Sequence, residues 1–215
     1  MKKPIIVFLI LLGQYFYAQE EKKSFATFSV TKPFLSFAPR VAIGYVHQLT
    51  ERSWLGIEAG YGSDGTRLDE RTKNGYRGFE IRPEFYYDTK ASERIKHFIS
   101  FSLFYIEKTQ VKTYDEYTSD DGDFTFDRAD YMRNKKGFTV SYAPMIPFGK
   151  STSFYFMPKI GVGLSNSNVQ YSNVINRQET SDRSDDWFSF GYFGSTERNG
   201  VVGDFNLDFK IVYRF

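Results

Sequence analysis

Hydrophobic and polar residues alternate with a period of two along most of the chain. The segment VVGDFNLDFKIVYRF, residues 201–215, shows this pattern most strictly. Its apolar positions are Phe205, Leu207, Phe209, Ile211, Tyr213 and Phe215. Successive side chains of a strand point to opposite faces of the sheet. Each alternating segment therefore predicts a β-strand with one apolar and one polar face.

Eight segments follow this pattern, and polar stretches separate them. The predicted strands are 24–31, 40–48, 54–62, 78–87, 95–112, 137–148, 154–165 and 201–215. Short and long connections alternate, and the longest predicted loops are 113–133 and 166–200. An even strand number with short periplasmic turns and longer outer loops is typical of bacterial outer-membrane barrels. We predict an all-β fold, an eight-stranded antiparallel transmembrane β-barrel in up-and-down meander order.

Two features complicate the strand pattern. The aromatic segment 187–196 would give an odd strand number, so we interpret it as a hairpin extension or an ordered outer loop. Pro83, Pro144 and Pro158 fall on outward positions, where proline cannot donate a hydrogen bond to the ladder. Bulges or local breaks are expected at these prolines.

The first eighteen residues have the layout of a secretory signal peptide. Lys2 and Lys3 precede the apolar run 5–12, and Ala18 precedes a polar stretch. The apolar run is too short to span a bilayer as a helix. We therefore expect a signal peptide at 1–18, a barrel domain at 19–215 and export to the outer membrane.

Composition excludes several classes of protein. The chain has no cysteine, which excludes disulfides, thiol chemistry and a lipid-modified cysteine. Its 28 basic residues include Lys2 and Lys3, so 26 basic and 26 acidic residues follow residue 18. This balance argues against a nucleic-acid partner, which requires a basic surplus. Aromatic residues make up 19% of the chain, as expected where rings line a membrane interface.

The polar face distinguishes a membrane barrel from a soluble barrel of the lipocalin type. It is rich in Gly, Ala and Ser, which suit a crowded lumen only eight strands wide. A face exposed to solvent would carry mostly Lys, Glu and Thr. Tyrosines near the ends of the apolar faces suit the headgroup region. The pattern favours the membrane barrel.

The stretches GYVHQLTERSWLGIEAGYG and GFEIRPEFYYD carry a family resemblance. A tyrosine-bearing strand, a short turn with Glu and Arg, and an R-P-E-aromatic strand follow one another. The matching residues are Tyr45, Leu49, Glu51, Arg52, Gly56, Arg82, Pro83, Glu84 and Tyr86. The chain resembles a family of small Gram-negative outer-membrane β-barrels of unknown function. This resemblance implies fold and location, and it implies no activity.

Charged residues on the polar face form the sharpest candidate site. The predicted lumen charge cluster is Glu58, Glu80, Arg82, Glu84, Lys159, Asp208, Lys210 and Arg214. Isolated charges are costly in a low dielectric, so these residues should pair. One hypothesis is a salt-bridged plug, and the other is a narrow polar pore. The small diameter of an eight-stranded barrel favours the plug.

Signs of catalysis are weak. His47 and His97 both lie beside predicted periplasmic turns, away from outer-leaflet lipid. No nucleophile motif or metal-spaced histidine pair is present, so we expect no enzyme, no cofactor and no metal. The acidic runs 119–127 and 181–187 lack the spacing of a calcium loop.

The expected role is structural or binding, performed by a closed barrel that displays two long outer loops. A narrow channel is the alternative, and a lipid-modifying enzyme is a weaker one. The expected partners are outer-membrane lipid and lipopolysaccharide, a protein that contacts the outer loops, and the barrel-assembly machinery. The proposed assembly signal is Phe209, Ile211, Tyr213 and Phe215.

Overall fold

A computed structural model describes residues 23–66, 75–89, 95–119, 121–149, 153–180 and 199–215. The predicted signal peptide 1–18, the acidic run 181–187 and the segment 187–196 lie outside these residues. Within the described part of the chain, no helix is long and apolar enough to cross a membrane.

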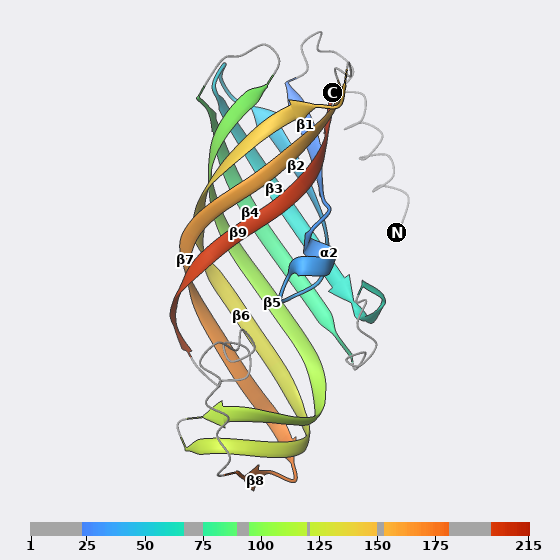
Figure 1. Cartoon of the computed structure of the whole chain (residues 1–215), viewed down its shortest axis with the longest axis vertical. Helices are drawn as coiled ribbons and strands as arrows, with labels where there is room; N and C mark the ends of the chain where they lie inside the picture. Colours follow the sequence, from blue (N-terminus) through green and yellow to red (C-terminus); the bar gives the residue numbers. More distant parts are fainter. Residues whose placement is uncertain (1–22, 67–74, 90–94, 120, 150–152, 181–198) are drawn as a thin grey trace, which may run out of the picture.

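Eight antiparallel strands close into a barrel, in which every strand pairs with its neighbours in chain order (Figure 1). The barrel strands are β1 (Ser24–Ser29), β2 (Val41–Gln48), β3 (Ser53–Ser63), β4 (Arg77–Asp88), β5 (Lys96–Ser119), β6 (Gly122–Pro147), β7 (Phe154–Ile175) and β9 (Asn199–Arg214). Pairing of β9 with β1 and of β5 with β6 completes the ring. The predicted eight-stranded meander is confirmed. A two-residue strand, β8 (Gln178–Glu179), adds only to the edge of β6.

The register around the barrel sets its shape. A row of paired residues starts at Ile211, passes through Phe28, Ile43 and each following strand, and returns to β9 at Val201. The row is therefore displaced by ten residues along β9. For eight strands this stagger corresponds to a tilt of about 40° and an interior that side chains can fill.

The two faces of the strands have the predicted polarity. Large hydrophobic side chains point away from the barrel axis on every strand, for example Ile57, Phe101 and Val140. We call this outward set the apolar belt. Small residues on the inner face let the strands crowd together: a Cβ on Gly163 would lie 1.9 Å from the carbonyl oxygen of Phe138. The lumen is narrow because small inward residues let the strands lie close together and the larger inward side chains pack tightly.

The prolines interrupt hydrogen-bonded ladders without shifting them. On β4 and β5 the pairing stops after Ile81–Tyr105 and resumes at Glu84–Ser102, on either side of Pro83. The pairing of β6 with β7 is interrupted in the same way around Pro144. Of the two expected outcomes, local breaks occur at these positions and bulges do not, because proline removes a donor and leaves the number of residues unchanged.

The predicted loop 113–133 is wrong, and so is the first part of the predicted loop 166–200, of which residues 181–198 lie outside the described residues. Strands β5 and β6 continue as a paired hairpin to Ser119 and Gly122, and β7 continues to Ile175. This extension stands beyond the apolar belt, at the end opposite Phe215 (Figure 1). It forms because aromatic side chains alternate with the charges, and they pack into their own cluster. The buried members of this cluster are Tyr117, Phe124, Phe126, Ala129, Tyr131, Val169 and Tyr171.

The end of the β5–β6 hairpin curves sharply beyond the barrel (Figure 1). Tyr114 and Asn173 have φ angles of 50° and 52°, and the register of β6 with β7 shifts between Arg128 and Asp130. Burial raises the pKa of the Tyr131 hydroxyl, which lies within this aromatic cluster.

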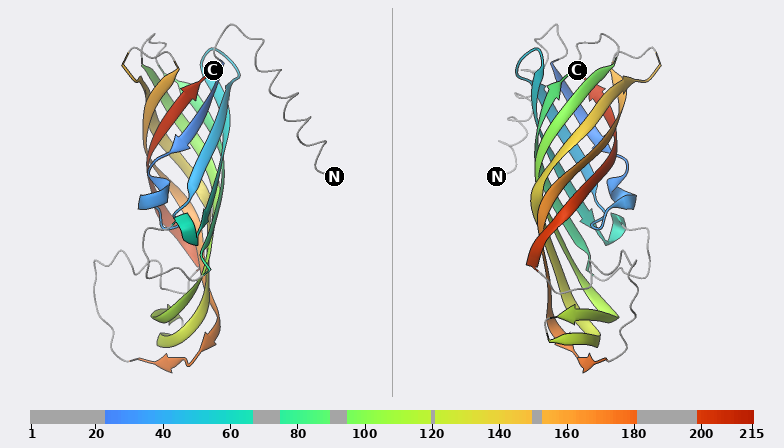
Figure 2. Two further views of the ribbon diagram at one scale, coloured as in Figure 1. Left: turned by 90° about the vertical axis from the view of Figure 1, so that its right-hand side faces the viewer. Right: turned by 60° about the vertical axis from the view of Figure 1, so that its left-hand side comes forward.

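The barrel wall is incomplete where the first and last strands meet, and we call this place the low part of the wall. Strand β1 pairs with β9 only from Phe25 to Ser29, and β9 continues without a described strand on that side from Phe209 to Asn199. Residues 30–40 leave the sheet here and form the one-turn helix α2 (Lys32–Leu35), with Pro33 in its first turn. Helix α2 lies against the side of the barrel, next to this part of β9 (Figures 1 and 2).

Candidate functional site

The interior of the barrel holds a network of buried ion pairs. Seven of the eight predicted lumen charges take part: one from β3, three from β4, one from β7 and two from β9. They are Glu58, Glu80, Arg82, Glu84, Lys159, Asp208 and Lys210. The period-two pattern places them inside, and the stagger of the strands brings them to one level of the lumen.

Lys210 joins the last strand to the opposite side of the network. Its Nζ lies 2.7 Å from a carboxylate oxygen of Glu58 and 3.3 Å from one of Glu84. Lys159 also pairs with Glu84 and donates a hydrogen bond to Ser102 at 3.1 Å. The Tyr86 hydroxyl donates to Glu84 as well. Strands β3, β4, β5, β7 and β9 are thereby linked across the interior.

A second group of cations surrounds Glu80. Arg82 donates to it at 2.8 Å, Arg40 at 2.6 Å and Lys32 at 2.8 Å. Lys32 also pairs with Glu58. Carboxylates held by several donors stay charged and fix the positions of those donors.

Asp208 anchors the segment that follows β1. It accepts hydrogen bonds from the hydroxyls of Ser29 and Thr31, each at 2.6 Å, and lies 3.9 Å from Lys210. Thr31 also accepts a hydrogen bond from the amide of Phe209 at 3.2 Å. These bonds hold the chain against β9 at the point where strand pairing ends.

Arg214, the eighth predicted residue, lies outside the network. Its guanidinium is 5.9 Å from the ring centre of Trp54, at the end of the barrel near Phe215. Trp54 belongs there to an apolar cluster that also contains Phe25, Tyr86 and Phe98. Alternation predicts the inward face of Arg214 but not its depth along the axis, and its described contact is with Trp54 rather than with the ion pairs. The apolar cluster fills this end of the lumen.

Lys32 and Arg40 are members of the network that the sequence pattern did not reveal. Both are buried. Lys32 lies outside every predicted strand, whereas Arg40 is the first residue of the predicted strand 40–48 and is not among the predicted lumen charges. The available signal was the excess of carboxylates among the predicted inward charges of β3 and β4, which need cations from elsewhere. With them, the network has five cations and four carboxylates.

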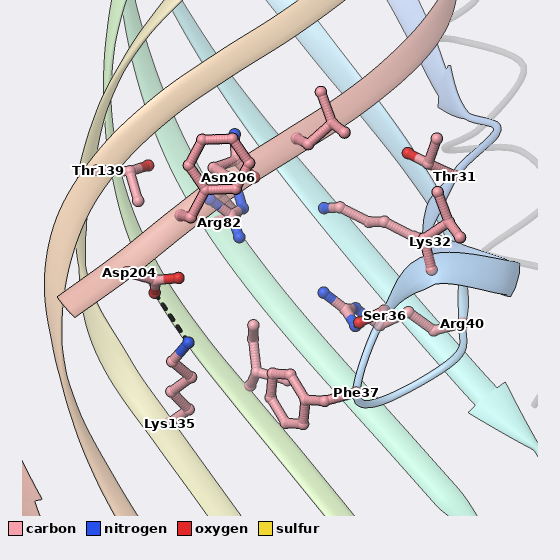
Figure 3. A pocket seen from close by; sticks show the side chains of 14 residues that line it. Thr31, Lys32, Ser36, Phe37, Arg40, Arg82, Lys135, Thr139, Asp204 and Asn206 are labelled. Carbon is pink, nitrogen blue, oxygen red and sulfur yellow. Dashed lines mark hydrogen bonds and ion pairs between the residues drawn. The ribbon is translucent and has the colours of Figure 1, made fainter. Parts of the chain in front are cut away.

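A polar cavity of about 140 Å³ adjoins the network, beneath the low part of the wall (Figure 3). Lys32, Arg40, Arg82 and Lys135 line it, and Asp204 is the single carboxylate among its lining residues. Lys135 and Asp204 form an ion pair of 3.1 Å. The cavity is therefore enclosed by a surplus of positive charge.

Two buried side chains that line the cavity have atoms without a hydrogen-bond partner among the described residues. They are Nη1 of Arg82 and Oγ1 of Thr139. Arg82 is 5% exposed and Thr139 is 1% exposed. A buried donor with no partner costs free energy, so such atoms indicate a place for a bound group.

The two histidines are held by neighbouring side chains. His47 shares a hydrogen bond of 2.8 Å with Ser24, and His97 one of 2.6 Å with Tyr142. Both pairs lie near the short turns, far along their strands from the cavity.

The acidic run 119–127 is engaged in local contacts. Asp123 accepts a hydrogen bond from Thr118 at 2.6 Å, and Asp121 lies 3.8 Å from Arg177. Among the described residues, no group of three or more potential metal ligands comes together.

The predicted assembly residues form an aromatic seam on the outer face. Phe209 stacks on Phe156 at 5.8 Å, and Tyr213 stacks on Phe215 at 5.9 Å. Phe215 exchanges backbone hydrogen bonds with Ser24, so it is held at the junction of β9 and β1.

Comparisons with known proteins found no relative. The chain matches no family model, no curated protein and no solved structure. What the structure defines is a closed eight-stranded antiparallel barrel with an ion-paired interior. The function must be argued from that geometry.

Proposed function

We propose that the chain is an outer-membrane β-barrel protein with a closed lumen and a structural or binding role. We also propose that it is a member of the family of small Gram-negative outer-membrane barrels that its sequence resembles. The short turns and Phe215 face the periplasm, and the extension of β5, β6 and β7 faces the outside. Residues 1–18 direct its export.

One observation carries the proposal: the polarity of the barrel is inverted relative to that of a soluble protein. Side chains such as Ile57 and Val162 are 50% and 66% exposed, whereas Glu58 and Lys210 are 0% and 1% exposed. Soluble proteins rarely expose continuous apolar patches of this kind. A hydrocarbon environment gives the exposed belt a favourable surrounding, and the closed ladder satisfies its backbone.

The closed lumen supports a role other than conduction. The ion-pair network crosses the middle of the barrel, and the cluster around Trp54 fills the end near Phe215. A buried network of this kind resists rearrangement, since separating one pair leaves an uncompensated charge. In planar bilayers we expect no stepwise openings. Openings that change with Glu84→Gln would instead support the channel.

The extension supports a binding role. Its aromatic cluster makes it rigid, and a hollow of about 410 Å³ opens on its surface. The hollow is lined by Asp115, Glu116 and Asp127, together with Tyr114 and Phe126. Tyr114 is 85% exposed beside these acidic residues, whereas Phe126 is buried beneath them. An acidic surface with an exposed aromatic ring suits contact with a protein, with lipopolysaccharide, or with the cations that bridge its phosphates.

Orientation and location are tested together by cysteine labelling, because the native chain has no cysteine. Thr125→Cys places a thiol on the exposed edge of the extension, and Glu51→Cys places one in the opposite turn. On intact cells, a membrane-impermeant maleimide should label the first variant and reach the second only after permeabilisation. Equal labelling of both, or recovery of the chain in the soluble fraction, would overturn the proposal.

A further inference from the structure

The low part of the barrel wall brings the polar cavity close to the apolar belt. Thr31, Lys32 and Arg40 approach it from the excursion 30–40, whereas Asp204 and Asn206 approach from β9 (Figure 3). Among the described strands, none pairs with β9 between Asn199 and Phe209 on this side. The cavity thus lies behind a gap in the hydrogen-bonded wall.

The rim of this gap is apolar. Leu35 on α2 is 73% exposed, and Phe205 and Leu207 on β9 point outward with the belt. All three also line the cavity. One group of residues therefore contacts both the polar interior and the proposed lipid phase.

The charges of the cavity favour an anion. The network has one more cation than carboxylates, and Lys135 is balanced only by Asp204. Within the described part of the chain, Nη1 of Arg82 and Oγ1 of Thr139 are buried without partners, and both can donate a hydrogen bond. A tetrahedral oxyanion can accept from guanidinium, ammonium and hydroxyl donors at the same time.

We propose that this cavity binds the phosphate of a phospholipid-type headgroup, whose acyl chains leave through the gap between α2 and β9. The inference rests on the proposed membrane location, and it adds a ligand class to the binding role. A cavity of about 140 Å³ accommodates one phosphate group, and Leu35, Phe205 and Leu207 contact the first part of the chains. The phosphate completes the hydrogen bonds of Arg82 and Thr139.

Native mass spectrometry of the folded chain in non-ionic detergent tests the site. The probes are phosphatidic acid, diacylglycerol with the same acyl chains, and inorganic phosphate. We expect one retained phosphatidic acid, no retained diacylglycerol, and much weaker binding of inorganic phosphate. Retention of diacylglycerol to the same extent would overturn the anion site. Inorganic phosphate binding as tightly as phosphatidic acid would overturn the lipid as its source.

Matched variants locate the binding. Thr139→Val and Lys135→Gln should each weaken phosphatidic acid binding roughly tenfold, the effect of one hydrogen bond or charge to a phosphate. Thr139→Val removes a hydroxyl that has no partner among the described residues, so the barrel should fold as well as the wild type. Lys136→Gln is the control, because Lys136 neighbours Lys135 but is exposed and does not line the cavity.

The outcomes separate this inference from the proposed function. A chain that inserts into lipid vesicles and retains no phosphatidic acid overturns the cavity as a binding site and leaves the membrane barrel intact. Equal weakening by Lys136→Gln and Lys135→Gln would also overturn the site, since it would indicate general surface attraction. A chain that fails to insert overturns the proposed function and this inference with it.

Discussion

Lys210 and Glu58 form a buried ion pair of 2.7 Å that connects the last barrel strand with β3 across the lumen. Both side chains are almost fully buried, and each also pairs with other members of the network. Lys210 lies opposite Ser29, the last residue of β1 that pairs with β9, so the ion pair crosses the lumen next to the gap in the wall. The stability of the barrel should therefore respond sharply to the loss of either charge.

Glu58→Gln should destabilise the barrel by about 3–5 kcal/mol, because it leaves Lys210 and Lys32 with an uncompensated buried charge. The double variant Glu58→Gln with Lys210→Met should be more stable than Glu58→Gln alone, since it removes the orphaned ammonium. Reversible unfolding by urea in lipid vesicles measures both differences. A double variant as unstable as the sum of its two single variants would show that the pair is not coupled.

Gly163→Ala should impair closure of β6 with β7, because the new methyl group would lie 1.9 Å from the carbonyl oxygen of Phe138. Overpacking of this kind costs about 1–3 kcal/mol when the neighbours can shift, and more when they are backbone. Gly203→Ala is the matched control, since a methyl group there would have no described atom within 4 Å. Heat-modifiable mobility on gels reports the folded fraction, and equal loss in both variants would contradict the packing argument.

Val140→Lys should destabilise the barrel by about 2–4 kcal/mol in a bilayer, the cost of a charge on the lipid-facing side. Gln170→Lys carries the same charge on the extension, where the side chain is exposed beyond the belt, and should cost little. Unfolding in vesicles compares the two. If water rather than hydrocarbon surrounds Val140, the two substitutions will have similar effects.

Much of the barrel could be predicted from sequence, because alternation determines which residues face inward. The strand from Asn199 to Arg214 and its inward charges Asp208 and Lys210 follow from this pattern alone. Depth along the axis does not follow from it, so the pattern alone does not separate Arg214, which lies near Trp54, from the ion-paired charges. The position of Lys32 depends on where the irregular segment 30–40 folds back, which the pattern does not predict. Arg40 lies on the polar face of the predicted strand 40–48, and its approach to Glu80 depends on the stagger of the strands.

The extension was missed for a different reason. Its acidic residues dominate the composition of 113–133, and they obscure the alternation of Phe124 with Phe126 and the nearby Tyr117. A polar stretch with regularly spaced aromatic side chains can form its own small core once it is paired in a hairpin. In this segment the periodicity, and not the acidic composition, indicates the structure.

Tyr171→Ala should loosen the extension and leave the barrel folded. Tyr171 stacks on Tyr117 with ring centres 4.6 Å apart and also contacts Phe126 and Tyr131. Loss of such an aromatic side chain costs about 3–5 kcal/mol in a packed core. Limited proteolysis should cut the variant in the extension while its heat-modifiable mobility stays unchanged. Ser172→Ala, at the exposed neighbour, should remain as resistant as the wild type.

The brevity of β1 has a consequence for how the cylinder forms and opens. Backbone hydrogen bonds join β1 to β9 only from Ser24 to Val30, whereas β7 and β9 pair all the way from Phe154 to Asn168. Strand pairing should open first at the shortest ladder of the barrel, and this ladder should also form last. The amides of β1 should therefore exchange with solvent before those of any other barrel strand, and the two ends of the sheet should meet only after the other strands have aligned.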